Sequence, residues 1–510
     1  MFPEPGNAER AVIIADSPMN LGVRFLVSYL QGLEGWQVYG LLVDNADSGR
    51  IEAPFSSEEL AFLTQALLAL DLRVLGISSI QRTRPRLAAC VPRIRASLPS
   101  AIYIAGGIDA IAEPAYYFAQ GIDLVCMGDG EEPLTHLLRT LAAGASRNQI
   151  VGSPPPGFMS MAKRRFSVPR APLAMPQPYY GNRMQRLTLG GIIPADHASN
   201  SPHVQFVNRE LAIDEFTQRG CTHACNFCAQ DLLLIYAGDS PRNSTRRELA
   251  KVVEDIRRVA KSYGHKQFVY FWDLDFLRRP QSELRAFAKL YPERVGLPFF
   301  AFVTEKTVIA AGEEILATLV HAGLRTINMG LQSGNRTILH EVYGRRNTPE
   351  EALQAIEIID RATVGRPSET IYDIITYHPA ESPEAILDSI RLVCRIPPGD
   401  GTRRVRLSTH LFSQNTGQAT YSATPTTSDY QDFVRRGQRE TQSPYLSFLL
   451  GRMMRGELTR EWIGNLRRQC IADLIRGETV SFMDGHIDSL GPLYEALMPQ
   501  DNAIFGDAGV

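Results

Sequence analysis

The sequence predicts an α/β protein with an N-terminal doubly wound, Rossmann-like domain, a partial (β/α)6 barrel of the TIM type and a mainly helical C-terminal domain. Three observations predict this arrangement. Short apolar runs alternate with helix-like segments up to about residue 145, the alternation returns from about residue 205, and the strand pattern fades past residue 425. Apolar strands that alternate with helices indicate parallel sheets covered by helices.

The N-terminal part contains five apolar runs that read as buried strands, and a helix-like segment follows each of them. The expected strands are 11–15, 38–43, 73–79, 101–105 and 122–126. The expected helices are 21–33, 57–70, 84–97, 113–120 and 131–141. Ser56 or Ser57 is a suitable N-cap for the second helix. This order predicts a doubly wound domain over residues 1–148.

Prolines crowd the next segment, with seven between residues 154 and 178. We expect no regular structure over 152–180 and a linker over 149–204. The barrel is expected over 205–425 and the helical domain over 426–510. The expected barrel strands are 212–217, 267–272, 298–303, 325–331, 371–377 and 404–411. The helices between them include 244–262, 312–322, 335–341, 349–361 and 383–394.

The overall composition is that of an ordinary globular protein. Its 510 residues include 53 Lys and Arg against 55 Asp and Glu, a net charge of −2, so we expect no nucleic-acid partner. The first ten residues do not resemble a signal peptide, and no apolar run approaches 18 residues, so we expect a cytoplasmic protein with no membrane span. Seven cysteines are too few, and odd in number, for a disulfide framework, which favours metal or redox chemistry where they cluster.

Three cysteines fall within eight residues, at Cys221, Cys225 and Cys228. They follow the expected strand 212–217, and barrel active sites lie at that end of the strands. Three thiolates can hold three irons of a [4Fe–4S] cluster and leave one iron for a non-protein ligand. Zinc and a purely structural cluster are the alternatives. Zinc is less favoured because it prefers four ligands in two halves, and His223 lies inside the loop.

This motif resembles the signature of radical S-adenosylmethionine (SAM) enzymes, CxxxCxxC with an aromatic residue, here Phe227, before the last cysteine. The resemblance implies that SAM chelates the open iron. An electron from the cluster then cleaves SAM to methionine and a 5′-deoxyadenosyl radical. It also implies an external electron donor of the flavodoxin or ferredoxin type.

Two later segments resemble the SAM-binding motifs of that family. The segment 271–275 ends the second barrel strand, where relatives contact the SAM amino group, although the glycines and glutamate of the simplest form are missing. The segment 328–334 resembles the family's GIESG segment, with Gln332 in place of the glutamate. An amide can still hydrogen-bond a ribose hydroxyl without carrying charge. The residues to which SAM binding is assigned are Phe227, Trp272, Asp273, Asp275, Gln332, Ser333 and Arg345.

Arg345 stands before Arg346, Thr348 and Glu350, a context common in these enzymes. Tyr377 and His378 stand where relatives have a Gly-Leu-Pro-Gly-Glu turn, and both are candidate substrate contacts. For each single residue the alternative is an ordinary polar group of the core or of a loop.

The N-terminal domain resembles the cobalamin-binding domain of cobalamin-dependent radical SAM enzymes. The resemblance rests on small residues at the ends of successive strands and on a Gly-Asp-Gly-Glu turn. The residues concerned are Ser78, Ser79, Gly106, Gly107, Gly128, Asp129, Gly130 and Glu131. The first loop, 16–22, has no histidine, so none from this loop can ligate cobalt. A domain that has lost its cofactor or that docks a protein is the alternative.

The resemblances imply methylation of an unactivated carbon of a small-molecule or peptide substrate, through a 5′-deoxyadenosyl radical and methylcobalamin. The implied cofactors are a [4Fe–4S] cluster, SAM and cobalamin. Radical rearrangement or cyclisation without net methyl transfer is the first alternative. A non-catalytic iron–sulfur protein that responds to SAM is the alternative from another class.

Overall fold

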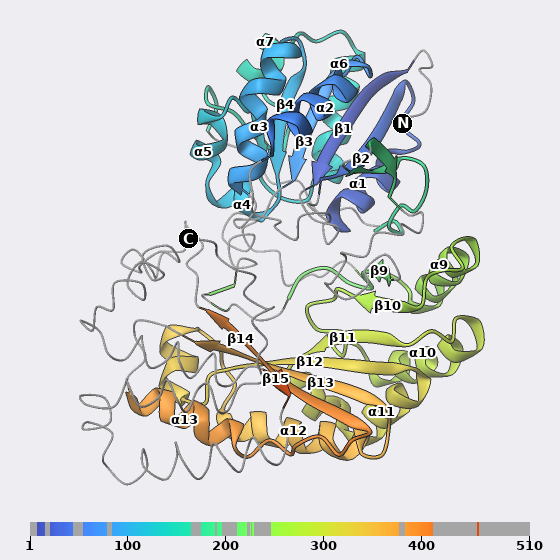
Figure 1. The fold of residues 1–510 in the computed structure, drawn as a ribbon, viewed down its shortest axis with the longest axis vertical. Helices are drawn as coiled ribbons and strands as arrows, with labels where there is room; N and C mark the ends of the chain where they lie inside the picture. The colour runs from blue at the N-terminus through green and yellow to red at the C-terminus, as the bar shows by residue number, and fades with distance from the viewer. Residues whose placement is uncertain are drawn as a thin grey trace. The chain divides into compact units, whose positions relative to one another are not determined.

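The computed structural model of the chain contains two compact units (Figure 1). The first comprises the described residues up to Asp273 together with 293–297, and the second the described residues of 274–292 and from 298 onward. The structure describes residues 8–15, 21–43, 55–78, 84–164, 175–188, 191–195, 212–221, 225, 227–228, 246–376, 383–411 and 456–457.

The first unit is built around an eight-stranded sheet in the order β6-β5-β4-β3-β1-β2-β7-β8. Its parallel centre consists of β1 (Glu9–Ala15), β2 (Trp36–Leu42), β3 (Val74–Ser78), β4 (Ile102–Gly106) and β5 (Leu124–Cys126). The order 2-1-3-4-5 is that of flavodoxin-like sheets, in which ligands bind beyond the carboxyl ends of the strands. The predicted doubly wound domain is confirmed.

Helices cover both faces of this sheet (Figure 1). They are α1 (Leu21–Leu30), α2 (Ser57–Leu68), α3 (Arg84–Ser97), α4 (Ile108–Ala112), α5 (Pro114–Ala119), α6 (Glu131–Ala142) and α7 (Arg147–Gly152). Strand β1 shows why the layers form, because its side chains alternate between two cores. Val12 and Ile14 join the core beneath α2 to α5, whereas Ile13 joins the core beneath α1 and α6. Ser56 caps α2 through a capping box with Glu59, as the sequence allowed.

The expectation that residues 152–180 contain no regular structure is wrong. Strand β6 (Phe158–Met159) pairs antiparallel with β5. Within the segment 149–204, β7 (Met184–Thr188) also pairs parallel with β2, and β8 (Gly191–Pro194) pairs antiparallel with β7. The sheet is therefore mixed. Both β6 and β8 are edge strands, the position in which neighbouring or internal prolines are tolerated.

The first unit also contains β9 (Ala212–Glu215), α9 (Leu249–Ser262) and β10 (Phe268–Phe271), with β9 and β10 parallel. Along the chain, α10 (Gln281–Arg294) follows.

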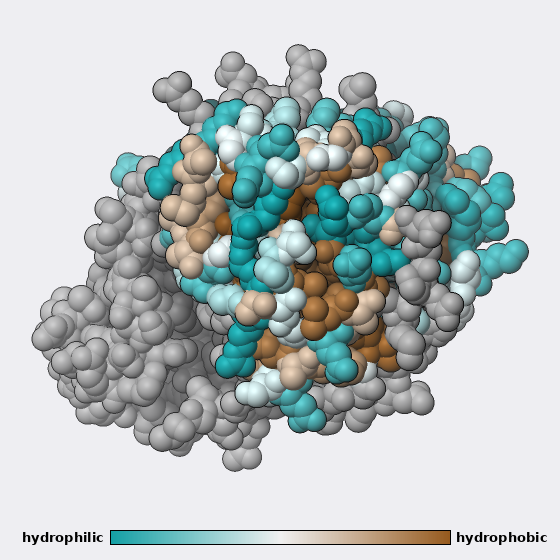
Figure 2. Space-filling model, turned by 90° about the horizontal axis from the view of Figure 1, so that it is seen from above, coloured by the Kyte–Doolittle hydropathy of each residue, from teal (hydrophilic) through white to brown (hydrophobic). Residues whose placement is uncertain are grey.

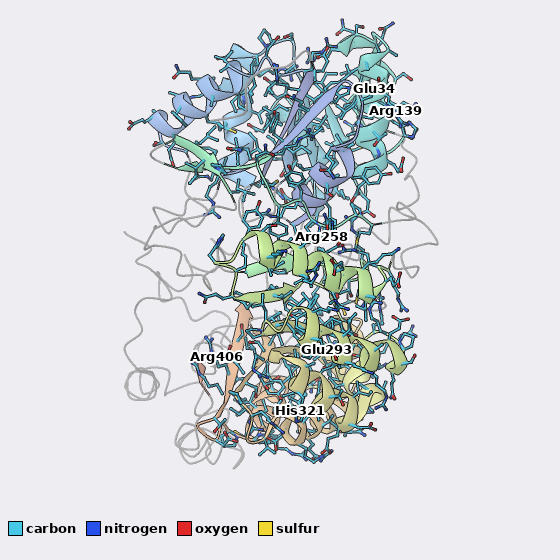
Figure 3. All side chains as sticks on the ribbon, turned by 90° about the vertical axis from the view of Figure 1, so that its right-hand side faces the viewer. Glu34, Arg139, Arg258, Glu293, His321 and Arg406 are labelled. Atoms are coloured by element: carbon cyan, nitrogen blue, oxygen red, sulfur yellow. The ribbon has the colours of Figure 1, made fainter. Side chains whose placement is uncertain are left out.

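Figure 2 shows one face of the molecule, on which hydrophobic residues gather among hydrophilic ones. Charged side chains such as Arg258 of α9 lie at the surface (Figure 3).

The second unit continues the strand–helix alternation. Its elements are β11 (Phe299–Val303), α11 (Glu305–Ala322), β12 (Leu324–Gln332), a π-helical turn (Ile338–Val342), α12 (Pro349–Thr363), β13 (Ser368–Thr376), α13 (Pro383–Val393), β14 (Arg403–Leu411) and β15 (Gly456–Glu457). Strands β11 to β14 pair in parallel, and β15 pairs antiparallel with β14. The predicted parallel strands of the barrel segment are confirmed. Nearly all of the predicted helical C-terminal domain lies outside the described residues.

None of the described helices is long and apolar enough to cross a membrane.

The packing of β7 on β2 gives a stability prediction. A Cβ atom on Gly40 would lie 2.5 Å from Met184 Sδ and 2.9 Å from Val23 Cγ1. Gly40→Val should therefore destabilise the fold by about 1–3 kcal/mol through overpacking, seen as a lower melting midpoint. Adding Met184→Ala should recover part of the loss. Gly32→Ala, where a Cβ meets nothing within 4 Å, is the control. An unchanged midpoint for Gly40→Val would contradict this packing.

Candidate functional site

The three clustered cysteines lie on one loop that follows β9. Cys225 is buried, and Cys221 and Cys228 are partly exposed. The Cys228 N–H donates to the Cys225 carbonyl at 2.9 Å. Among the described residues, no three His, Cys, Asp or Glu side chains are arranged around a single metal ion. Cysteine thiolates are the usual ligands of a [4Fe–4S] cluster, and this loop brings three of them together in sequence, one buried and two partly exposed.

The base of the cysteine loop is held by Asp273, whose side chain is fully buried. Its carboxylate accepts hydrogen bonds from Thr217 N at 2.8 Å, from Thr217 Oγ1 at 2.6 Å and from Gln218 N at 2.7 Å. Hydrogen bonds to charged groups contribute about 1.5–3 kcal/mol each. Both oxygens of Asp273 accept hydrogen bonds from the chain that leads to Cys221. Its predicted contact with SAM stays a prediction.

A buried ion pair lies beside this anchor. Glu215 ends β9, accepts a hydrogen bond from Phe216 N at 2.9 Å and pairs with Arg247. Arg247 also donates to the Phe216 carbonyl at 3.0 Å and pairs with Asp255, and its own N–H donates to the Thr217 carbonyl at 2.9 Å. Burial raises the pKa of Glu215 to about 8, against the lowering effects of Arg247 and the Phe216 N–H. Sequence reasoning missed this pair, although an acidic residue at a strand end next to the cysteines was a usable signal.

Trp272 is also engaged next to β9. Its indole N–H donates to Asp214 Oδ1 at 2.8 Å, and its ring packs on Tyr270 with 4.2 Å between centroids. Tyr180 fixes the backbone of the same strand residue, because its hydroxyl both accepts from Asp214 N at 2.7 Å and donates to the Asp214 carbonyl at 2.9 Å. These contacts join Trp272 and Tyr180 to Asp214 of β9, the strand that leads into the cysteine loop.

Arg219 links the cysteine loop to the Gly-Asp-Gly-Glu turn. Its guanidinium lies 2.5 Å from Glu131 Oε1 and 3.5 Å from Asp129 Oδ1. It also lies 5.0 Å above the ring of Phe25, a distance suited to a cation–π contact. The ring of Phe25 in turn lies 5.8 Å from that of Phe216. The two segments predicted to bind different cofactors therefore meet within one compact unit.

The residues predicted to bind cobalamin lie along the carboxyl edge of the first sheet. Ser78 and Gly106 are paired neighbours at the ends of β3 and β4. Gly107 follows with φ +87°, a conformation that favours glycine. Gly128 and Gly130 belong to the turn between β5 and α6, and Ser79 lies outside the described residues.

Asp275 lies in the second unit and is buried between two threonines. It accepts hydrogen bonds from Thr304 Oγ1 at 2.9 Å and from Thr307 Oγ1 at 2.8 Å. Burial raises its pKa to about 7, although both hydroxyls lower it. A carboxyl group that titrates near neutral pH can hold or release a proton under ordinary conditions.

Strand β12 ends at Gln332, one of the predicted SAM-binding residues, and Ser333 follows it directly. Gln332 has φ +67°, at a break in register between Gly330 and Gln332. A Cβ on Gly330 would lie 2.1 Å from Gln332 Nε2, so the amide lies over this glycine. A left-handed backbone at a residue other than glycine costs about 1–3 kcal/mol and often marks a ligand site.

The partners of Ser333 and Arg345 belong to the protein itself. Arg345 donates to the Gly330 carbonyl at 2.7 Å, to Glu305 Oε2 at 2.7 Å and to Asn347 Oδ1 at 2.8 Å. Ser333 Oγ lies 3.3 Å from Ser389 Oγ. These side chains therefore support the strand end that carries Gln332. Tyr377 and His378 lie outside the described residues, and Phe227 is partly exposed on the cysteine loop.

The sequence profile of the radical SAM superfamily matches residues 216–393. This segment begins one residue after β9, includes the three cysteines and ends with α13. Residues 216–393 belong to the radical SAM superfamily. The predicted resemblance is confirmed for this segment, and the family implies a [4Fe–4S] cluster and SAM as cofactors. No curated protein sequence matched the chain.

Two solved structures of the radical SAM methyltransferase TsrM from Kitasatospora setae are similar to this chain. The first, with tryptophan substrate and the SAM analogue aza-SAM bound, has a TM-score of 0.55 and 17% identity and covers 79% of this chain and 73% of TsrM. The second, with cobalamin and a [4Fe–4S] cluster bound, has a TM-score of 0.55 and 16% identity. It covers 79% of this chain and 72% of TsrM. At such low identity the likeness concerns the fold, and it confirms the predicted fold class.

The anchor formed by Asp273 gives a prediction for the radical SAM segment. Asp273→Asn replaces an acceptor oxygen with an amide donor and leaves at least one buried donor without its partner. We expect a loss of about 1.5–3 kcal/mol of stability. Less iron per chain should remain after anaerobic reconstitution, because the loop that carries Cys221 loses its fixed base.

Asp400→Asn is the matched control. Asp400 accepts hydrogen bonds from two backbone N–H groups, of Thr402 and Arg403, in a turn before β14. It should leave the iron content unchanged. Equal iron content in Asp273→Asn and wild-type protein would refute the role of Asp273 as the anchor of the loop.

Proposed function

We propose that the chain is a cobalamin-dependent radical SAM methyltransferase that methylates an unactivated carbon of a small-molecule or peptide substrate. The observation that carries this proposal is the likeness of fold to TsrM, described as a methyltransferase, over 79% of this chain. A likeness of that extent reaches beyond residues 216–393, the segment that matches the superfamily. It therefore includes part of the chain outside the radical SAM segment.

The loop after β9 would hold the iron–sulfur cluster through Cys221, Cys225 and Cys228. When bound, the cluster supplies the electron that cleaves SAM, and cobalamin supplies a cobalt centre that carries a methyl group. Asp273 fixes the base of the loop, so the thiolates keep their positions. A fixed geometry matters because reacting groups must be held close together and aligned. An external flavodoxin- or ferredoxin-type protein would donate the electrons.

Cobalamin would lie at the carboxyl edge of the first sheet. The small residues Ser78, Gly106 and Gly107 let a large flat ligand approach the backbone there. The loop 16–22 offers no histidine, and the first histidine in the sequence is His136. Cobalt would therefore receive no imidazole from that loop.

SAM would bind at the open iron. Gln332, at the end of β12, keeps the assignment that the resemblance of 328–334 to a family motif implies, a hydrogen bond to the SAM ribose. The left-handed backbone conformation of Gln332 supports this assignment, because residues other than glycine that adopt it are concentrated at ligand sites. Its amide can both donate and accept hydrogen bonds.

The proposal predicts two distinct products from SAM. Anaerobically reconstituted protein with cobalamin and a chemical reductant should form 5′-deoxyadenosine. It should also transfer the labelled methyl group of [methyl-13C]SAM to cobalamin with release of S-adenosylhomocysteine. Cys225→Ala should lose the cluster, its visible absorption and 5′-deoxyadenosine formation. Cys394→Ala, at a buried cysteine far along the sequence from the loop, is the control and should retain all three.

The outcomes separate the functional classes. Absence of 5′-deoxyadenosine in cluster-loaded protein would favour the non-catalytic SAM-responsive protein. Formation of 5′-deoxyadenosine without S-adenosylhomocysteine would favour a rearrangement or cyclisation enzyme and refute the methyltransferase.

A further inference from the structure

Arg219 occupies a defined place at the start of the cysteine loop. The preceding residue, Gln218, is held by Asp273 through its backbone N–H. The following residue, Gly220, has φ +82°, a left-handed turn that favours glycine, and Cys221 comes next. The backbone before Arg219 is therefore fixed, and Arg219 lies two residues from the first cysteine.

The side chain of Arg219 makes its described contacts with the N-terminal part of the first unit. The pair with Glu131 is largely buried, since the two side chains are 19% and 2% exposed. Phe25 of α1 covers the guanidinium, and Asp129 provides a second carboxylate at 3.5 Å. Separation of a buried pair leaves an uncompensated charge. The cysteine loop and the turn before α6 are therefore more stable when Arg219 and Glu131 stay paired.

The turn itself is tied to the sheet on which cobalamin is proposed to bind. Glu131 is the first residue of α6, directly after Gly130. Tyr29 of α1 contacts Glu132, so the beginning of α6 is joined to α1. A ligand that orders this turn therefore acts on an element that is also bound to Arg219.

We propose that Arg219 is a positioning residue that couples the two cofactor sites, so that cobalamin binding at the Gly128–Glu131 turn strengthens SAM binding at the cysteine loop. This inference rests on the proposed function. The physical basis is that the first ligand orders the joint arrangement of turn and loop, and the second ligand then binds at a smaller entropic cost. The coupling is reciprocal, and couplings of this kind change affinity by about 5–150-fold.

The experiment measures the dissociation constant of SAM on the full-length, cluster-loaded protein with and without saturating cobalamin. The readout is the amount of SAM that the protein retains in equilibrium dialysis with its cluster oxidised, because an oxidised cluster supplies no electron to cleave SAM. We expect cobalamin to tighten SAM binding at least about fivefold in the wild type. The ratio of the SAM dissociation constants without and with cobalamin should fall close to one in Arg219→Gln and in Glu131→Gln. Iron content and circular dichroism check that both variants fold.

Two further variants separate the charge from general damage. Arg219→Lys keeps the cation and should retain part of the coupling, as should the exchange of charges in the double variant Arg219→Glu, Glu131→Arg. The matched control is Arg257→Gln, which removes an arginine from an exposed pair with Glu254 on α9, next to the Arg258 labelled in Figure 3. It should keep the wild-type ratio.

Each contrary outcome has a clear meaning. Three outcomes would overturn this inference and leave the proposed function intact. The first is full coupling in Arg219→Gln, and the second is a loss in Arg219→Lys as complete as in the glutamine variant. The third is a wild type that binds both ligands independently. A wild type that binds SAM but no cobalamin would overturn the proposed function and this inference together.

Discussion

The buried carboxylate of Asp273 is the interaction on which the site depends. It belongs to the residues that follow β10, yet it accepts hydrogen bonds from Thr217 and Gln218, which follow β9. A buried carboxylate is stable only when its oxygens find donors, and here the donors are the groups that begin the cysteine loop. The hydrogen bonds that satisfy the buried carboxylate therefore also fix the start of the cysteine loop.

A second constraint joins this loop to the first sheet. Arg219 leaves the fixed base and pairs with Glu131, so the cysteine loop and the turn before α6 share one compact unit. If this chain uses cobalamin and a cluster as we propose, the two centres are held by elements that contact each other directly. That arrangement suits a reaction in which two cofactors serve one substrate.

The sequence predicted what depends on local pattern, and missed what depends on distant partners. Strand–helix alternation and the cysteine spacing are local, and the alternation predicted the parallel strands β1 to β5 and β9 to β14. Asp273 was assigned to SAM from the resemblance of 271–275 to a family motif. Its hydrogen bonds to Thr217 and Gln218 span 56 and 55 residues and the Arg219 contact spans 88 residues, which no local pattern predicts. Strands β6 to β8 were missed because the prolines around them were weighed without knowing that β6 and β8 are sheet edges.

The most direct test of the account is the magnetic interaction between the two proposed centres. EPR spectra would be recorded on wild-type protein that contains both cob(II)alamin and the reduced cluster, and compared with samples that hold only one of them. The account predicts that each signal is broadened or split by the other, because the turn and the loop are in contact. Two signals that simply add, with line shapes unchanged from the single-centre samples, would contradict it.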